Sequence, residues 1–259
     1  MSNLIVGKNS QLGFYLQDNN SSVLSLSESF CDDKLYNKIF ILAAEQRTFL
    51  NLPYSDFYDV NVKKTIALVE KKIDFCQKMY IFLTSELWNN YSGPIDTNVT
   101  FNFTPSNYIL SKYHLQKKII KNFQNDERII MVYPFNFNST MRRSGTLFGK
   151  VFETIIDGVQ NNFSNLNFKR DFSHTTYVAD RIKELQFDSV IGSGQLFHMK
   201  QFVYDLCEHF EVDKSLFLLS DFQPKMNEFY DKNGKYSYEQ LLKDTIEDIT
   251  KVYKNKYGK

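Results

Sequence analysis

The sequence has few of the features that mark disulfide, metal and nucleic-acid proteins. Its three cysteines, Cys31, Cys76 and Cys207, are far apart and form no CxxC pair, so we expect neither a disulfide framework nor a zinc site. The four histidines are scattered, and no metal is expected at any of them. The formal net charge is +1 and the lysines are interspersed with acids, which excludes the basic surface that nucleic-acid binding requires.

Long apolar runs are also missing. No stretch approaches the roughly 20 apolar residues that span a bilayer, and the N-terminus lacks the basic and apolar regions of a secretory signal. We therefore expect a cytoplasmic protein with no membrane partner. The chain of 259 residues, 42% hydrophobic and 24% charged, is long enough for one large domain or for one domain with a small lobe.

Short apolar segments alternate with helical patterns in the first half of the chain. Runs typical of strands occur at 4–6, 23–27, 38–42, 79–83 and 128–133, and helical periodicity occurs at 59–72 and 108–123. This alternation predicts an α/β protein with a Rossmann-type, doubly wound parallel sheet, whose ligand lies at the C-terminal ends of the strands. Residues 1–135 would form this domain.

The pattern changes beyond residue 135. Helices are predicted at 148–158, 199–210 and 238–253, with short extended segments near 168 and at 189–191. We expect residues 136–259 to form a small, mostly helical C-terminal lobe, with some segments returning to the sheet.

The turn after the first predicted strand has a glycine at each end. Gly7 ends the strand and Gly13 lies in the next helix, an arrangement that leaves backbone N–H groups available to a pyrophosphate. The middle glycine of the usual pattern is replaced by Ser10, so a plain strand-to-helix turn remains the alternative. The candidate cofactor-binding residues of this turn are Gly7, Asn9, Ser10, Gln11, Leu12 and Gly13.

The residue that ends the second predicted strand bears on the choice between NAD and NADP. NAD-binding folds commonly have Asp or Glu there, about 20 residues after the first glycine, where the carboxylate binds the ribose. This chain has Ser27, followed by Glu28. A neutral Ser27 admits a 2′-phosphate and favours NADP(H), whereas Glu28 would reverse the preference if its side chain reached the same place.

Tyr108 and Lys112 are four residues apart and therefore lie on one face of a predicted helix. A Lys ammonium one turn from a phenol lowers the pKa of the tyrosine, at about 1.4 kcal/mol per pKa unit, so that the tyrosine can donate a proton near neutral pH. The alternative is an ordinary helix surface, because Tyr and Lys are frequent in this chain.

Several segments in this order resemble those of the extended short-chain dehydrogenase/reductase family, in its group of nucleotide-sugar epimerases, dehydratases and ketoreductases. The first turn is similar to the phosphate loop of the dTDP-4-dehydrorhamnose reductases. The other similar segments are 41–45, where small alanines accommodate the cofactor, 84–88, with the catalytic hydroxyl, the substrate turn 134–136, and the Arg-Asp-Phe-x-His segment 170–174.

The resemblance implies a role for each matched residue. Tyr108 would be the proton donor, Thr84 would orient the reacting oxygen, and Lys112 would hold the nicotinamide ribose. Further cofactor contacts would come from Ser27, Ala43, Ala44, Lys112 and Tyr133, although an Arg is usual in place of Tyr133. The C-terminal lobe would bind the substrate, and the candidate substrate-binding residues are Glu86, Asn136, Arg143 and Arg170.

These residues predict an NADPH-dependent C4-ketoreductase of a nucleotide-linked 4-keto-6-deoxy sugar, in surface-polysaccharide biosynthesis. An epimerase or a 4,6-dehydratase that retains NAD is the alternative, with Glu86 as the base that removes the C5 proton. Relatives also have an additional strand and helix after the second strand, for which the dozen or so residues after Ser27 leave no room. This truncation permits a non-catalytic cofactor-binding protein as well. A homodimer formed through the helix at 108–123 is possible by analogy.

Overall fold

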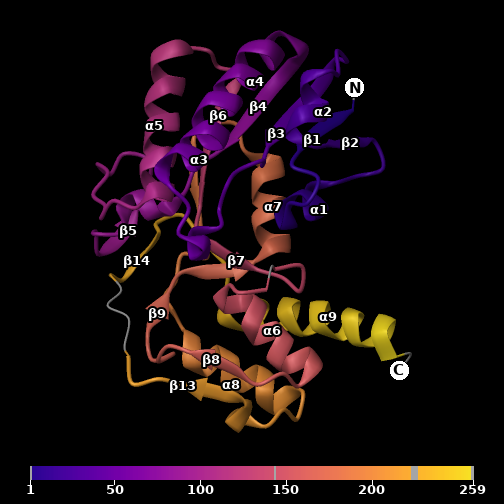
Figure 1. The fold of residues 1–259 in the computed structure, drawn as a ribbon, viewed down its shortest axis with the longest axis vertical. Coiled ribbons are helices and arrows are strands. Elements are labelled where there is room, and N and C mark those ends of the chain that lie inside the picture. The colour runs from indigo at the N-terminus through magenta and orange to yellow at the C-terminus, as the bar shows by residue number, and fades with distance from the viewer. Residues whose placement is uncertain (1, 143, 223–226, 258–259) are drawn as a thin grey trace. The chain divides into compact units, whose positions relative to one another are not determined.

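The computed structural model describes residues 2–142, 144–222 and 227–257 (Figure 1). The chain forms two compact units, each assembled from several segments. Unit 1 comprises Met1–Trp88, Thr97–Pro134 and Ala179–Ile191, and unit 2 comprises Asn89–Asp96, Phe135–Val178 and Gly192–Lys259.

A six-stranded, entirely parallel sheet forms the centre of unit 1, in the order β11-β6-β4-β3-β1-β2. Met79, Tyr80 and Ile81 point alternately to its two faces and have no exposed surface, so both faces are covered. The predicted Rossmann-type α/β fold is confirmed. The strands are β1 (Asn3–Val6), β2 (Ser21–Leu24), β3 (Tyr36–Ile41), β4 (Cys76–Phe82), β6 (Ile129–Pro134) and β11 (Ser189–Ile191).

The helices of unit 1 include α5, which begins after the N-cap Ser106 and buries Ile109, Leu115 and Ile119 at helical spacing. A π-helical stretch, Asp59–Lys64, joins α3 to α4 within the predicted helix 59–72. The helices are α1 (Gln11–Leu16), α2 (Leu26–Phe30), α3 (Tyr54–Tyr58), α4 (Thr65–Lys72) and α5 (Asn107–Asn122), and α7 (Thr175–Glu184) begins in unit 2 and ends in unit 1.

The strand order reverses direction between β1 and β3. From β1 the chain moves outward to β2, then returns to place β3 on the other side of β1 and continues to β4. In open α/β sheets, ligands bind outside the carboxyl ends of the strands at such a switch point. Gly7 follows β1 there, and Ala43 and Ala44 follow β3.

The predicted end of the second strand is wrong. Strand β2 ends at Leu24, and Ser27 lies in α2. The physical reason is a capping box: Ser25 Oγ accepts a hydrogen bond from Glu28 N at 3.2 Å, and Glu28 Oε2 accepts one from Ser25 N at 2.7 Å. Since β3 follows α2 directly, β2 is the edge strand of the described sheet.

Unit 2 is built around phenylalanine. The rings of Phe148, Phe172 and Phe202 contact one another in its core, beside further buried aromatic and aliphatic side chains. Its helices are α6 (Leu147–Asp157), α8 (Met199–His209) and α9 (Tyr238–Tyr257). Its strands form pairs: β5 (Gly93–Ile95) with β14 (Phe229–Asp231), β7 (Asn136–Asn138) with β10 (Phe172–His174), β8 (Asn161–Phe163) with β13 (Phe217–Leu219), and β9 (Lys169–Arg170) with β12 (Phe197–His198).

Candidate functional site

The turn between β1 and α1 contains one position that requires glycine and one where the chain packs too closely for a side chain to fit without a shift of its neighbours. Gly7 has φ +131°, and a Cβ atom there would lie 3.0 Å from Ala43 N. A Cβ at Gly13 would lie 3.1 Å from Cγ2 of Ile5, because α1 packs closely on β1. The turns after β1 and β3 thus approach each other at the switch point, and this glycine-lined cradle fits a dinucleotide.

The other residues of this turn have distinct local roles. Ser10 is the N-cap of α1, and its Oγ accepts a hydrogen bond from Gly13 N at 3.3 Å. The Leu12 side chain is buried, so only its backbone could face a cofactor. Asn9 and Gln11 lie in the turn and at the start of α1. Cofactor binding by these residues stays a prediction.

Lys112 is held at the carboxyl end of β4. Its ammonium is buried, and Nζ donates a hydrogen bond to the Phe82 carbonyl at 2.7 Å. Nζ also lies 5.9 Å from the centre of the Tyr108 ring, one turn earlier on α5. Burial disfavours the charged form and lowers the pKa of Lys112 to about 7.

Thr84 lies two residues beyond Phe82 and is buried. Its Oγ1 accepts a hydrogen bond from Glu86 N at 3.3 Å, which leaves the hydroxyl hydrogen able to donate to another oxygen. Glu86 is partly exposed in the turn Ser85–Trp88. The structure therefore places Thr84, Tyr108 and Lys112 at the same edge of the sheet as the glycine-lined cradle.

Two residues outside the predicted set, Asn61 and Ser111, connect these elements. The Asn61 side chain accepts from Glu45 N at 2.7 Å, donates to Glu45 O at 3.1 Å, and donates to Ser111 Oγ at 2.9 Å. Ser111 Oγ in turn donates to the Tyr108 carbonyl at 2.7 Å. An asparagine between Val60 and Val62, inside the predicted helix 59–72, was the available sequence signal for this network.

The Tyr133 side chain is buried in an aromatic cluster. Its ring contacts Trp88 and Phe101 at centroid distances of 5.3 and 6.0 Å, and its hydroxyl lies 3.8 Å from Met131 Sδ. Burial raises the pKa of Tyr133, so the phenol stays protonated. Its predicted contact with the cofactor stays a prediction.

Two of the predicted substrate-binding residues meet in unit 2. With the Asn136 amide oriented so that its oxygen faces the guanidinium, this oxygen accepts from Arg170 Nε at 2.7 Å and from Nη2 at 2.8 Å. The neighbouring Asp171 is buried and accepts from Ser193 N and Oγ at 2.7 Å. Burial raises the pKa of Asp171 to about 6. Arg143 lies outside the described residues.

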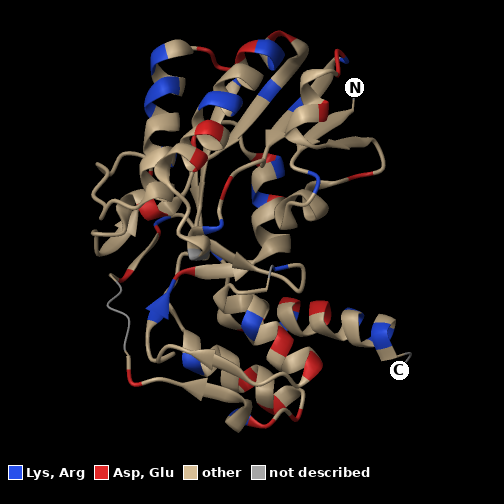
Figure 2. Ribbon diagram, in the orientation of Figure 1, with Lys and Arg blue, Asp and Glu red and all other residues tan. Residues whose placement is uncertain are grey.

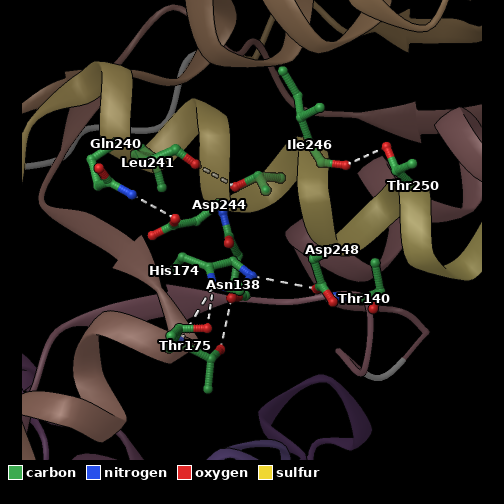
Figure 3. Close-up of polar contacts among 12 residues, drawn as sticks. Asn138, Thr140, His174, Thr175, Gln240, Leu241, Asp244, Ile246, Asp248 and Thr250 are labelled. Atoms are coloured by element: carbon green, nitrogen blue, oxygen red, sulfur yellow. Dashed lines mark hydrogen bonds and ion pairs between the residues drawn. The ribbon is translucent and has the colours of Figure 1, made fainter.

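A second polar cluster in unit 2 surrounds His174, at the end of the 170–174 segment (Figure 3). His174 Nε2 lies 3.3 Å from Asp248 Oδ2, and this carboxylate also accepts from Thr140 N at 2.7 Å. Thr175 Oγ1 donates to the Asn138 carbonyl at 2.7 Å. Through these hydrogen bonds α9 is held against the loop after β7 and the start of α7. They give His174 a role in packing.

In residues 2–142, 144–222 and 227–257, no three His, Cys, Asp or Glu side chains are arranged as metal ligands. Figure 2 shows basic and acidic residues on both units. Among the described helices, none is long and apolar enough to cross a membrane.

No family model matches the sequence, and no curated protein matches it either. The fold, however, is similar to that of several solved structures. The dTDP-glucose 4,6-dehydratase of Bacillus anthracis str. Ames, in complex with NAD, has a TM-score of 0.77 at 16% identity, over 100% of this chain and 99% of that chain.

Two further structures are similar to the same extent. A UDP-N-acetylglucosamine 4-epimerase of Methanobrevibacter ruminantium M1 in complex with UDP-N-acetylmuramic acid has a TM-score of 0.78 at 13% identity, over 97% of this chain and 98% of that chain. RMD of Pseudomonas aeruginosa complexed with NADPH has a TM-score of 0.77 at 14% identity, over 97% and 100%. At these identities the comparison establishes the fold.

Proposed function

We propose that this chain is an NAD(P)-dependent oxidoreductase of the extended short-chain dehydrogenase/reductase type that acts on a nucleotide-linked sugar. The observation that supports this most strongly is the position of the buried Lys112. Its ammonium lies one turn from Tyr108 and is held by the carbonyl of Phe82, two residues before Thr84. These residues share the carboxyl edge of the sheet with the cradle formed by Gly7 and Ala43. The similar structures, which bind NAD, NADPH or sugar nucleotides, support the same proposal.

The reaction needs a proton at the oxygen of a ketone as negative charge develops on it. A dihydronicotinamide bound in the cradle would supply the hydride. Thr84 donates a hydrogen bond to the ketone oxygen and orients it, and Tyr108 donates the proton. Lys112, with a pKa of about 7, can return a proton to Tyr108 near neutral pH.

The most specific form of the proposal is a C4-ketoreductase of a 4-keto-6-deoxy sugar linked to a nucleoside diphosphate, in surface-polysaccharide biosynthesis. It is supported by the similarity of the 7–13 turn and of the 108–112 segment to those of sugar ketoreductases. In unit 2, Asn136 and Arg170 would bind the substrate, together with Arg143; an arginine suits the diphosphate because its guanidinium binds phosphate oxygens in pairs.

A 4,6-dehydratase is the second candidate, and Glu86 is the observation that favours it. Its carboxylate follows Thr84 in the same turn, the place from which a base would remove a C5 proton. Such an enzyme would keep its NAD through the cycle, whereas a reductase exchanges NAD(P)H at each turnover.

The cofactor preference predicted from Ser27 has lost its structural basis. Ser27 is an exposed residue of α2, and its Oγ lies 3.1 Å from Ser25 Oγ. Because Ser27 does not end β2, its neutral side chain gives no support for NADP(H) over NAD(H). We propose that the chain binds a nicotinamide dinucleotide and that the charges around the adenosine ribose decide between NAD(H) and NADP(H).

One assay separates these functions. The purified chain is mixed with NADH or NADPH and an enzymatically generated 4-keto-6-deoxy sugar nucleotide, and the nicotinamide absorbance is followed. A reductase oxidises the cofactor in proportion to sugar reduced, while a dehydratase converts the 6-hydroxy sugar nucleotide without added cofactor. If neither conversion occurs with any sugar nucleotide and neither cofactor binds, the proposed function is wrong.

A further inference from the structure

The end of β2 lies beside the turn that follows β1. Val6 pairs with Leu24, the last residue of β2, and Gly7 N donates a hydrogen bond to the Leu24 carbonyl at 2.8 Å. Strands β1 and β2 run parallel to each other, so their C-terminal ends lie at the same edge of the sheet. A side chain that reaches the end of β2 therefore also faces the glycine-lined cradle.

The Glu28 carboxylate is held at this place by the capping box of α2. Ser25 directly follows Leu24, and its backbone N–H donates to Glu28 Oε2 at 2.7 Å. The other oxygen, Oε1, is 3.9 Å from Lys8 Nζ, which extends from the turn after β1. Hydrogen bonding by Ser25 lowers the pKa of Glu28, so the carboxylate is ionised at neutral pH.

A dinucleotide bound on a glycine-rich turn has its adenosine ribose at the end of the second strand, where a carboxylate accepts the 2′-hydroxyl and repels a 2′-phosphate. Here the strand ends in Leu24 and contributes no acid. We infer that Glu28, supplied by α2 through its capping box, makes this selection, and that the chain prefers NAD(H) to NADP(H). The inference rests on the proposed function only in requiring that a nicotinamide dinucleotide binds.

The neighbours of Glu28 make the preference depend on one charge. Lys8 is exposed and pairs with Glu28, and the hydroxyls of Ser25 and Ser27 lie on the first turn of α2. Without the carboxylate, an ammonium and two hydroxyls would remain, a set that suits a phosphate. Glu28 therefore repels the 2′-phosphate, and it also pairs with the Lys8 ammonium that would otherwise attract this phosphate.

Glu28→Gln is the direct test, because glutamine retains the capping box and removes only the charge. Dissociation constants for NADH and NADPH are measured by nicotinamide fluorescence and calorimetry, with no sugar present. The wild-type chain should bind NADH more tightly. The variant should shift the ratio of the two constants toward NADPH by about fivefold or more.

Two further variants keep the test decisive if Glu28→Gln unfolds. Lys8→Ala should weaken NADPH binding further in the wild-type background and should cancel the gain in the Glu28→Gln background. Glu127→Gln removes the same charge before β6, at the amino edge of the sheet, and should leave the ratio unchanged. High salt should reduce the effect of Glu28→Gln, because exposed charges are screened.

The outcomes distinguish this inference from the proposed function. A wild-type chain that binds NADPH more tightly than NADH overturns the inference and leaves the oxidoreductase proposal standing, as does a ratio that Glu28→Gln and Lys8→Ala both leave unchanged. Failure of the wild-type chain to bind either cofactor overturns the proposed function, and the inference with it.

Discussion

Lys112 is a cation that the fold buries next to a single backbone carbonyl. Its Nζ bonds to Phe82 O, and burial lowers its pKa to about 7, far below the value of a lysine in the unfolded chain. The buried ammonium destabilises the folded state while it is charged, and the deprotonated amine does not carry this penalty. Lowered lysine pKa values of this kind cluster at functional sites, which supports the role proposed for Lys112.

The pH dependence of the free energy of unfolding follows from the pKa values of Lys112 in the folded and in the unfolded chain. Below about pH 7 both states carry the charge and the native state bears its full cost; between pH 7 and about 10.4 only the unfolded state is charged, so stability rises with pH. We expect Lys112→Met to stabilise the cofactor-free chain most below pH 7, at about 1.4 kcal/mol per unit of lowered pKa, and the gain to vanish near pH 10.5.

Urea unfolding at a series of pH values measures this difference, with Lys118→Met as the control. Lys118 is exposed on the same helix, so its replacement should give an offset that does not depend on pH. A Lys112→Met offset that is equally flat would contradict the account of a desolvated ammonium.

At the scale of elements, the Asn61 side chain joins the π-helical stretch, the turn after β3 and helix α5. It is 1% exposed and makes three hydrogen bonds, two to the Glu45 backbone and one to Ser111. Asn61→Ala would leave the Glu45 N–H and C=O groups without these partners. We expect it to lower the free energy of unfolding by about 2–4 kcal/mol, since unpaired buried polar groups cost about 1–3 kcal/mol each.

Ser111→Ala provides the comparison for Asn61, because it removes the bonds of Ser111 Oγ to Asn61 and to the Tyr108 carbonyl but leaves both bonds between Asn61 and Glu45. It should cost about 1–2 kcal/mol, the net contribution of two typical hydrogen bonds. Denaturant unfolding of both variants measures the two losses. An Asn61→Ala loss no larger than that of Ser111→Ala would show that the bonds to Glu45 contribute little.

The elements also differ in how far the sequence could predict them. Apolar runs located β3 to within two residues and β4 to within three, and 3.6-residue periodicity located α5 to within one. The end of β2 was missed because the capping signal of Ser25 and Glu28 outweighs the extended pattern that continues to Ser27. The mixed polar pattern of α7 and the short strand pairs of unit 2 carry too little periodicity to predict.

The candidate site was predictable where its residues are close in the sequence. Tyr108 and Lys112 share a helix face, and the glycine turn is a local pattern. The bond from Lys112 to Phe82, the approach of Gly7 to Ala43, and the contact of Asn136 with Arg170 join residues distant in the sequence. Tertiary packing alone sets these contacts.

At the scale of the whole molecule, neither unit is a continuous segment. The chain passes repeatedly between them, and α7 begins in one and ends in the other without interruption. Shared elements of this kind couple the unfolding of both units. We therefore expect the chain to unfold in one cooperative transition.

Trp88 makes this expectation measurable, because it is the single tryptophan of the chain and is buried in unit 1, where its Nε1 donates to Val99 O at 2.8 Å. Its fluorescence reports on unit 1, whereas far-ultraviolet circular dichroism reports on the helices of both units. The two denaturation curves should coincide. Circular dichroism that changes in two steps, with fluorescence following only one, would contradict this expectation.

In the proposed reaction, Tyr108 donates a proton during hydride transfer to a sugar ketone. Its role is measured by single-turnover oxidation of the cofactor by a 4-keto-6-deoxy sugar nucleotide, compared between the wild-type chain and Tyr108→Phe. We predict a rate about 10²- to 10⁴-fold lower in the variant, the contribution of a general acid, with the cofactor dissociation constant nearly unchanged. Equal rates in the two proteins, or a loss fully explained by weaker cofactor binding, would contradict it.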